Sequence, residues 1–276
     1  MKKCLSVFLF LFAGSIVFAQ ENFSLPFSTT TVTADGDAHD WTTPLKHYDP
    51  NTRLFFDFKN DSNNLYLCFQ TNDVATQTKL LRAGMKITLS SKINGKHKAT
   101  IGFPMPASVA KPAEADNASA AESRFSHRKS QAVLMAGDTL MELKGFTSAD
   151  GIVSSANKNG INAAIKSDDN DMFTYEAVIP LKELLGNNFE IKDASREILL
   201  SATISAMKRS ESDNRRSESG FSEEGEGGRM GGGREGGMGR GGARMGGNGG
   251  GNYSMDRSAL YDKSELKQKL SLAIHP

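Results

Sequence analysis

The feature that most constrains this chain is a pair of short runs in which hydrophobic residues occupy every second position. The first run is Arg53–Lys59, the second is Asn64–Gln70, and the polar residues 60–63 join them. A period of two places alternate side chains on opposite faces of a strand, and Asn and Asp favour tight turns. The segment therefore predicts an antiparallel β-hairpin. Because its second face is also half apolar, the hairpin fits best inside a two-sheet sandwich.

Similar alternation recurs along the rest of the chain. It predicts further strands at Phe27–Ala34, Met85–Ser90, Ala99–Phe103, Ala132–Met135, Thr139–Phe146, Ile152–Ser155, Ile161–Lys166, Met172–Leu181, Glu197–Met207 and Leu266–Ile274. A short helix is expected at Asp73–Ala83, with Asp73 as N-cap and Val74, Leu80 and Leu81 as apolar contacts. The expected fold is all-β, an antiparallel two-sheet β-sandwich of jelly-roll or immunoglobulin-like type with short helices and a disordered glycine-rich loop.

The first residues have the pattern of a secretory signal peptide. Lys2 and Lys3 precede an apolar run that ends at Val17-Phe18-Ala19, which indicates cleavage after residue 19. We therefore expect a protein exported to the periplasm, the outer envelope or the medium of a bacterium, with no integral membrane segment after cleavage. Without the two lysines the formal net charge falls from +1 to −1, which gives no electrostatic case for binding nucleic acid.

The mature chain, residues 20–276, is expected to form a single sandwich domain with two long additions. Residues 107–130 are rich in Ala, Ser and charged residues and predict a surface excursion. Residues 210–255 predict a disordered insertion before the last strand, because 17 of the chain's 27 glycines fall within Gly220–Gly251 and ordering glycine costs much entropy.

Three motifs carry a resemblance to a known family. They are Asp-Gly-x-x-x-Asp-Trp at Asp35–Trp41, the hairpin sequence Asn-Asp-x-Asn-Asn-Leu-Tyr-Leu-x-Phe at residues 60–69, and Tyr-Glu-Ala-Val-Ile-Pro-Leu at Tyr175–Leu181. Together they make the chain, over about residues 30–208 and the last strand, resemble the family 9 carbohydrate-binding module and the wider DOMON-like superfamily of exported bacterial proteins. The resemblance implies a β-sandwich and a non-catalytic binding function.

Aromatic residues are the candidates for stacking on a sugar. Trp41, Tyr48, Tyr66 and Tyr175 are the positions considered. Trp41, the only tryptophan, has a second interpretation as a residue packed under the sheet, which is the role that the resemblance implies for it. Glu176 lies in a predicted strand beside aromatic residues, and we expect it to be structural.

Asp35, Asp37 and Asp40 form a carboxylate cluster beside Trp41. Closely spaced aspartates in a loop are typical calcium ligands, although the spacing is not that of an EF-hand. Aspartates that serve only the turn are the alternative. Calcium is thus the cofactor that Asp35, Asp37 and Asp40 suggest.

The function expected from the sequence is binding of a carbohydrate or another envelope glycan. The alternatives are a haem- or metal-binding sandwich protein and a scaffold with a protein partner. No nucleophile, zinc-protease or phosphate-loop motif of an enzyme occurs in the sequence.

Overall fold

The computed structural model describes residues 22–91, 97–105, 140–187, 190, 197–207 and 257–274. The expected signal peptide, the excursion at 107–130, the insertion at 210–255 and the strand at 132–135 lie outside these residues, so they stay predictions. No helix in the described part of the chain is long and apolar enough to cross a membrane.

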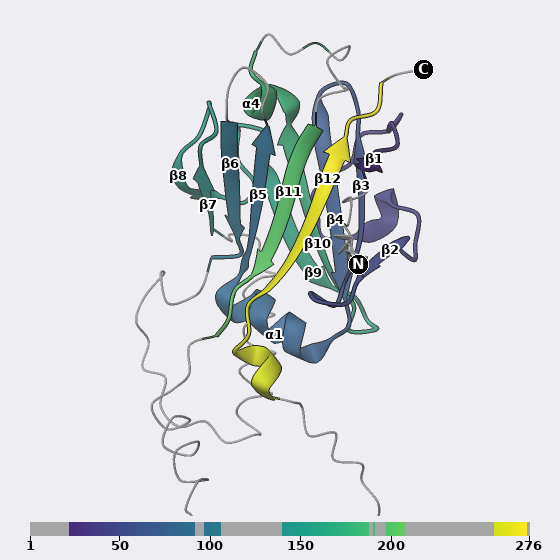
Figure 1. Ribbon diagram of the computed structural model, residues 1–276, viewed down its shortest axis with the longest axis vertical. Coiled ribbons are helices and arrows are strands. Elements are labelled where there is room, and N and C mark those ends of the chain that lie inside the picture. Colours follow the sequence, from purple (N-terminus) through teal and green to yellow (C-terminus); the bar gives the residue numbers. More distant parts are fainter. Residues whose placement is uncertain are drawn as a thin grey trace, which may run out of the picture.

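The structure is a two-sheet β-sandwich, which confirms the expected fold class (Figure 1). Sheet A has the strand order β1-β12-β11-β5-β6-β7-β8, and sheet B has the order β2-β3-β4-β10-β9. All neighbouring strands are antiparallel except β1 and β12, which pair in parallel. Their bounds are β1 Asn22–Ser24, β2 His47–Asp49, β3 Leu54–Asn60, β4 Asn64–Thr71, β5 Met85–Ser91, β6 His97–Phe103, β7 Leu140–Lys144, β8 Gly151–Ser154, β9 Asn162–Ser167, β10 Phe173–Pro180, β11 Glu197–Ile204 and β12 Ser264–Ser271.

The predicted hairpin forms as strands β3 and β4. Phe56 pairs with Phe69 and Phe58 with Leu67, and all four side chains are buried. The turn between the strands is held by Asp61, whose Oδ1 accepts hydrogen bonds from the backbone N–H groups at positions 63 and 64, at 2.7 and 2.6 Å. The carboxylate thus replaces backbone partners that the chain reversal removes.

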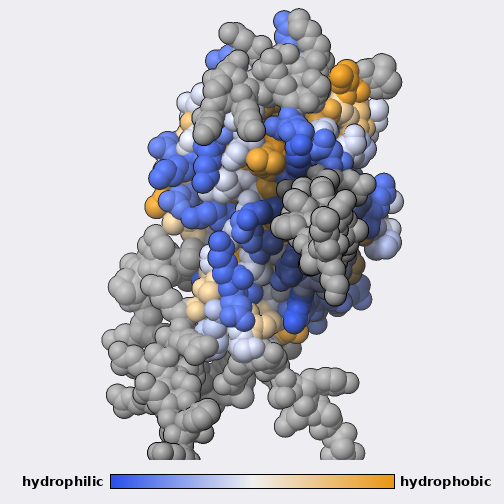
Figure 2. Space-filling model, in the orientation of Figure 1, coloured by the Kyte–Doolittle hydropathy of each residue, from blue (hydrophilic) through white to orange (hydrophobic). Residues whose placement is uncertain are grey.

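The core lies between the sheets and is built from alternate residues of nearly every strand. Its aromatic centre includes Tyr175, whose ring meets Phe69 and Phe103 edge to face, with centroids 6.0 and 5.5 Å away. This is the geometry that aromatic pairs prefer. The opposite face of sheet A is largely hydrophilic (Figure 2), with Leu199 45% exposed on it.

Short helices cover the two ends of the sandwich (Figure 1). Helix α1 spans Val74–Ala83 and helix α4 spans Leu181–Leu185, while a 3-10 turn, η3, spans Arg257–Leu260. Asp73 caps α1 by accepting a hydrogen bond from Thr76 N at 2.8 Å, as predicted. The prediction that Val74 supplies an apolar contact is wrong, since this side chain is 50% exposed.

The prediction of a first strand at Phe27–Ala34 is wrong. Phe27–Ala34 forms no strand and contributes only the isolated bridge between Phe27 and Asn60. The first strands are instead β1 and β2, on either side of this segment. Residues 28–46 do not pair with a strand of either sheet. Their apolar side chains, Val32 among them, pack instead on the outer face of sheet B.

Candidate functional site

The outer face of sheet B is divided into a covered part and an open part. Residues 28–46 cover one part and bury a small hydrophobic group, here called the outer cluster, that is separate from the core. Its members are Val32, Ala38, Trp41, Leu45, Tyr66 and Cys68. The rest of the face carries a row of side chains that follows the strand register from β2 to β9. This row, here called the aromatic row, consists of Tyr48, Phe55, Gln70, Thr174 and Lys166. One member of the row, Thr174, is buried, and the others are half-buried or exposed.

Glu176 fixes the covering segment to the sheet. Its Oε1 accepts a hydrogen bond from Trp41 Nε1 at 2.7 Å, and its Oε2 accepts from the backbone N–H groups of Gly36 at 2.9 Å and Asp35 at 3.2 Å. The side chain is only 1% exposed. A buried carboxylate is tolerated when such donors replace water, so Glu176 is structural, as expected.

Lys59 closes the same arrangement from strand β3. Its Nζ lies 4.6 Å from the centroid of the Trp41 ring and donates a hydrogen bond to the backbone oxygen of Asp40 at 2.7 Å. Partial burial lowers the pKa of Lys59, an effect that the nearby carboxylates oppose. Trp41 is therefore packed between a cation and a carboxylate and is 9% exposed. It has the structural role of a residue packed on the sheet, and its ring does not form a platform for a sugar.

The pKa of Glu176 gives this contact a pH dependence. Burial raises the pKa from 4.5 to about 7, against the opposing effect of its three N–H donors. The folded protein therefore keeps this proton at pH values where the unfolded chain has lost it. Between about pH 4.5 and 7 the contribution of Glu176 to the free energy of unfolding should fall as the pH rises, and it should level off above that window.

Urea unfolding at several pH values, followed by the fluorescence of the single tryptophan, measures this effect. The reference is Glu176→Gln, which does not titrate. The difference in stability between the wild type and this variant should shrink from pH 4.5 to 7. A difference that stays constant across the window would contradict the raised pKa.

The predicted ligand-binding tyrosines do not lie together. Tyr66 and Tyr175 are 0% and 1% exposed, so neither offers a ring face to a ligand. Tyr66 instead donates a hydrogen bond to Asp61 Oδ2 at 2.5 Å, and burial raises its pKa to about 12. Tyr48 alone among the four aromatic candidates is well exposed, at 52%.

The predicted calcium ligands lie in the loop that Glu176 holds. Asp35 Oδ1 accepts a hydrogen bond from the backbone N–H of Asp37, and Asp40 Oδ2 accepts one from that of Thr33. The imidazole of His39 lies 3.6 Å from Asp37 and 3.4 Å from Asp40. Within the described residues no three His, Cys, Asp or Glu side chains gather in a way that would hold a metal ion, and calcium at this turn stays a prediction.

The aromatic row contains residues that the sequence did not single out. The ring of Tyr48 lies against that of Phe55, with centroids 4.8 Å apart and planes at 45°. Next along the row, Gln70 Nε2 donates a hydrogen bond to the Thr174 hydroxyl at 3.0 Å. Lys166 at the far end is exposed. The signal for this row was Phe55 itself, an aromatic residue on the face of β3 that otherwise carries Asp57 and Lys59.

The accessible groups of the aromatic row are the ring of Tyr48, the amide of Gln70 and the ammonium group of Lys166. The amide donates and accepts hydrogen bonds, and the ammonium group donates them. No protein-family model, curated protein or solved structure matches this chain.

Proposed function

We propose that this protein is an exported, non-catalytic binding module that takes a carbohydrate on the open face of sheet B. The observation that carries the proposal is the half-exposed ring of Tyr48, which packs against the ring of its cross-strand neighbour Phe55 with centroids 4.8 Å apart. A tyrosine fixed in this way presents a rigid apolar surface with a polar tip. Such a surface suits the C–H face of a sugar ring.

The rest of the aromatic row supplies the polar part of the proposed contact. Gln70 lies on β4, the strand next to Phe55, and Thr174 lies on β10, one strand further across the sheet. Neighbouring strands are about 4.8 Å apart. A saccharide that stacks on Tyr48 and extends across the strands would therefore meet the amide of Gln70, which the buried Thr174 hydroxyl holds in place, and then the Lys166 ammonium. The resemblance to family 9 carbohydrate-binding modules supports the same proposal.

Titration calorimetry with neutral oligosaccharides tests the proposal. The probes are cellohexaose, xylohexaose, mannohexaose and chitohexaose. We expect at least one to bind, and Tyr48→Ala to weaken that binding at least tenfold, because the substitution removes the stacking surface. Tyr48→Phe, the matched control, should stay within about threefold, since the ring is kept.

Because Tyr48 is exposed, the test can separate a loss of binding from a loss of folding. A surface substitution of this kind changes stability by about 0.5 kcal/mol or less, so a loss of binding would not reflect unfolding. If none of the four probes binds, or if Tyr48→Ala binds as well as the wild type, the aromatic row is not a carbohydrate site.

A further inference from the structure

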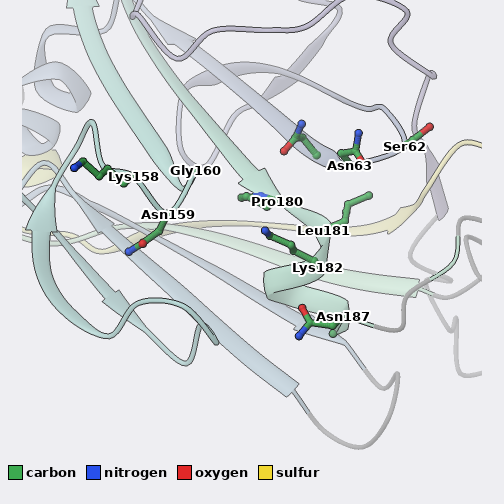
Figure 3. Close-up of a pocket in the computed structure, with 11 residues that line it drawn as sticks. Ser62, Asn63, Lys158, Asn159, Gly160, Pro180, Leu181, Lys182 and Asn187 are labelled. Carbon is green, nitrogen blue, oxygen red and sulfur yellow. The ribbon is translucent and has the colours of Figure 1, made fainter.

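A second polar surface lies at the α4 end of sheet B. It is a hollow of about 520 Å³ between the β3–β4 turn, the loop before β9 and helix α4 (Figure 3). This volume is within the usual range for small-molecule sites. The residues that line it are Ser62, Asn63, Asn64, Lys158, Asn159, Gly160, Pro180, Leu181, Lys182, Gly186 and Asn187.

The lining combines amides with positive charge. Four of the lining residues are asparagines and two are lysines, and none is Asp or Glu. Each asparagine amide offers two N–H donors and a carbonyl acceptor, while each lysine offers only donors and a positive charge. A ligand matched to these groups carries hydroxyl groups for the amides and a negative charge for the ammonium groups.

The walls of the hollow are fixed by hydrogen bonds that use backbone groups and the side chains of Asp61 and Asn157, neither of which lines it. On one side Asp61 holds the turn, and Leu181 N donates to Asn63 O at 2.7 Å, which ties α4 to that turn. On the other side Asn157 Oδ1 accepts from Asn159 N at 2.9 Å, and Asn157 Nδ2 donates to Ile161 O at 2.6 Å. A preformed frame of this kind lowers the entropic cost of binding.

The position of the lysines decides which one a ligand would meet. Figure 3 shows the side chain of Lys182 extending past Pro180, whereas that of Lys158 points away from the other labelled residues. Gly160 adopts φ +79°, and a Cβ at this position would lie 3.2 Å from Pro180 Cγ. Pro180 is buried, and the absence of a side chain on Gly160 lets the loop before β9 pack closely against it. The exposed Lys182 is therefore the charged group that a ligand in the hollow would meet.

We propose that this hollow is a second binding site, selective for an acidic sugar residue. The carboxylate of the sugar pairs with Lys182, and its hydroxyls bond the amide of Asn63. The site is distinct from the aromatic row, because Asn64 and Gln70 lie six residues apart on β4, which corresponds to about 20 Å. The proposal does not depend on binding of a neutral glycan at Tyr48.

The experiment compares two ligands of one shape that differ in charge. Trigalacturonate and its fully methyl-esterified form are titrated by calorimetry into the full chain without its predicted signal peptide. We expect the acid to bind at least tenfold more tightly than the ester, and the difference to shrink at high salt. Lys182→Gln should weaken binding of the acid at least tenfold while leaving the weak binding of the ester unchanged.

Two controls locate the effect. Lys166→Gln removes an exposed lysine of the aromatic row and should leave binding of the acid unchanged, and so should Tyr48→Ala. Inorganic phosphate at equal ionic strength should not displace the acid, since it offers charge without the matching hydroxyls. Equal affinity for acid and ester, insensitivity to Lys182→Gln, or displacement by phosphate would each overturn the proposal, whatever the outcome with neutral oligosaccharides.

Discussion

Replacing Glu176 by alanine should lower the free energy of unfolding at pH 7 by about 3–5 kcal/mol, because it removes the acceptor for three N–H groups in a buried site. The indole N–H of Trp41 and the backbone N–H of Gly36 and Asp35 would all lose their partner. Chemical denaturation followed by circular dichroism measures the change.

The matched control is Glu142→Ala, which removes a glutamate from an exposed position in strand β7. It should change stability by no more than about 0.5 kcal/mol. Trp41→Phe keeps most of the apolar surface and deletes only the indole donor, so a double-mutant cycle with Glu176→Ala should show a coupling of about 0.5–3 kcal/mol. Equal effects of Glu176→Ala and Glu142→Ala would show that the covering segment is held by packing alone.

Gly145→Ala should destabilise the fold by about 2–5 kcal/mol. Gly145 follows β7 with φ +77°, and a Cβ there would lie 2.3 Å from the backbone oxygen of Lys98. The substitution therefore combines the cost of a left-handed conformation, about 1–2 kcal/mol, with a backbone displacement that typically costs about 1–3 kcal/mol.

Gly151→Ala, in the same β7–β8 hairpin, separates these two contributions. Gly151 also has a positive φ, +96°, but nothing lies within 4 Å of the added Cβ. We expect this variant to lose only the conformational part, and hence to unfold at a higher denaturant concentration than Gly145→Ala. If both variants unfold at the same denaturant midpoint, the close approach of the added Cβ to the Lys98 backbone does not lower the free energy of unfolding.

The strands could be predicted from the sequence wherever one face is buried in the core. In β10 the inward residues Phe173, Tyr175 and Ala177 and in β11 the inward residues Ile198 and Leu200 follow a period of two, and this period depends only on the pleat. The structure of segment 28–46 was predicted wrongly because its apolar residues pack on the face of a sheet, whereas the prediction placed part of the segment in a strand. The three-residue strands β1 and β2 are too short for a periodic signal.

The candidate sites were harder to predict because they depend on pairs that are distant in sequence. The contact of Glu176 with Gly36 spans 140 positions, and no local pattern encodes it. Residue type does not distinguish the three candidate tyrosines. In the structure Tyr48 is exposed, whereas Tyr66 and Tyr175 are buried. The lining of the hollow includes Asn63 of the β3–β4 turn, Asn159 of the loop before β9 and Lys182 of helix α4, and no local sequence pattern places these three residues around one hollow.

The parallel pairing of β1 with β12 has a mechanical consequence. Asn22 lies beside Lys269 and Ser24 beside Ser271, and the backbone N–H of Leu25 continues the contact by donating a hydrogen bond to Ser271 O at 2.9 Å. The two strands run in the same direction, so tension between the start of β1 and the end of β12 acts along both of them in opposite senses. Such a load shears the bonds of the pair together and does not peel them one at a time, as it would in an antiparallel hairpin.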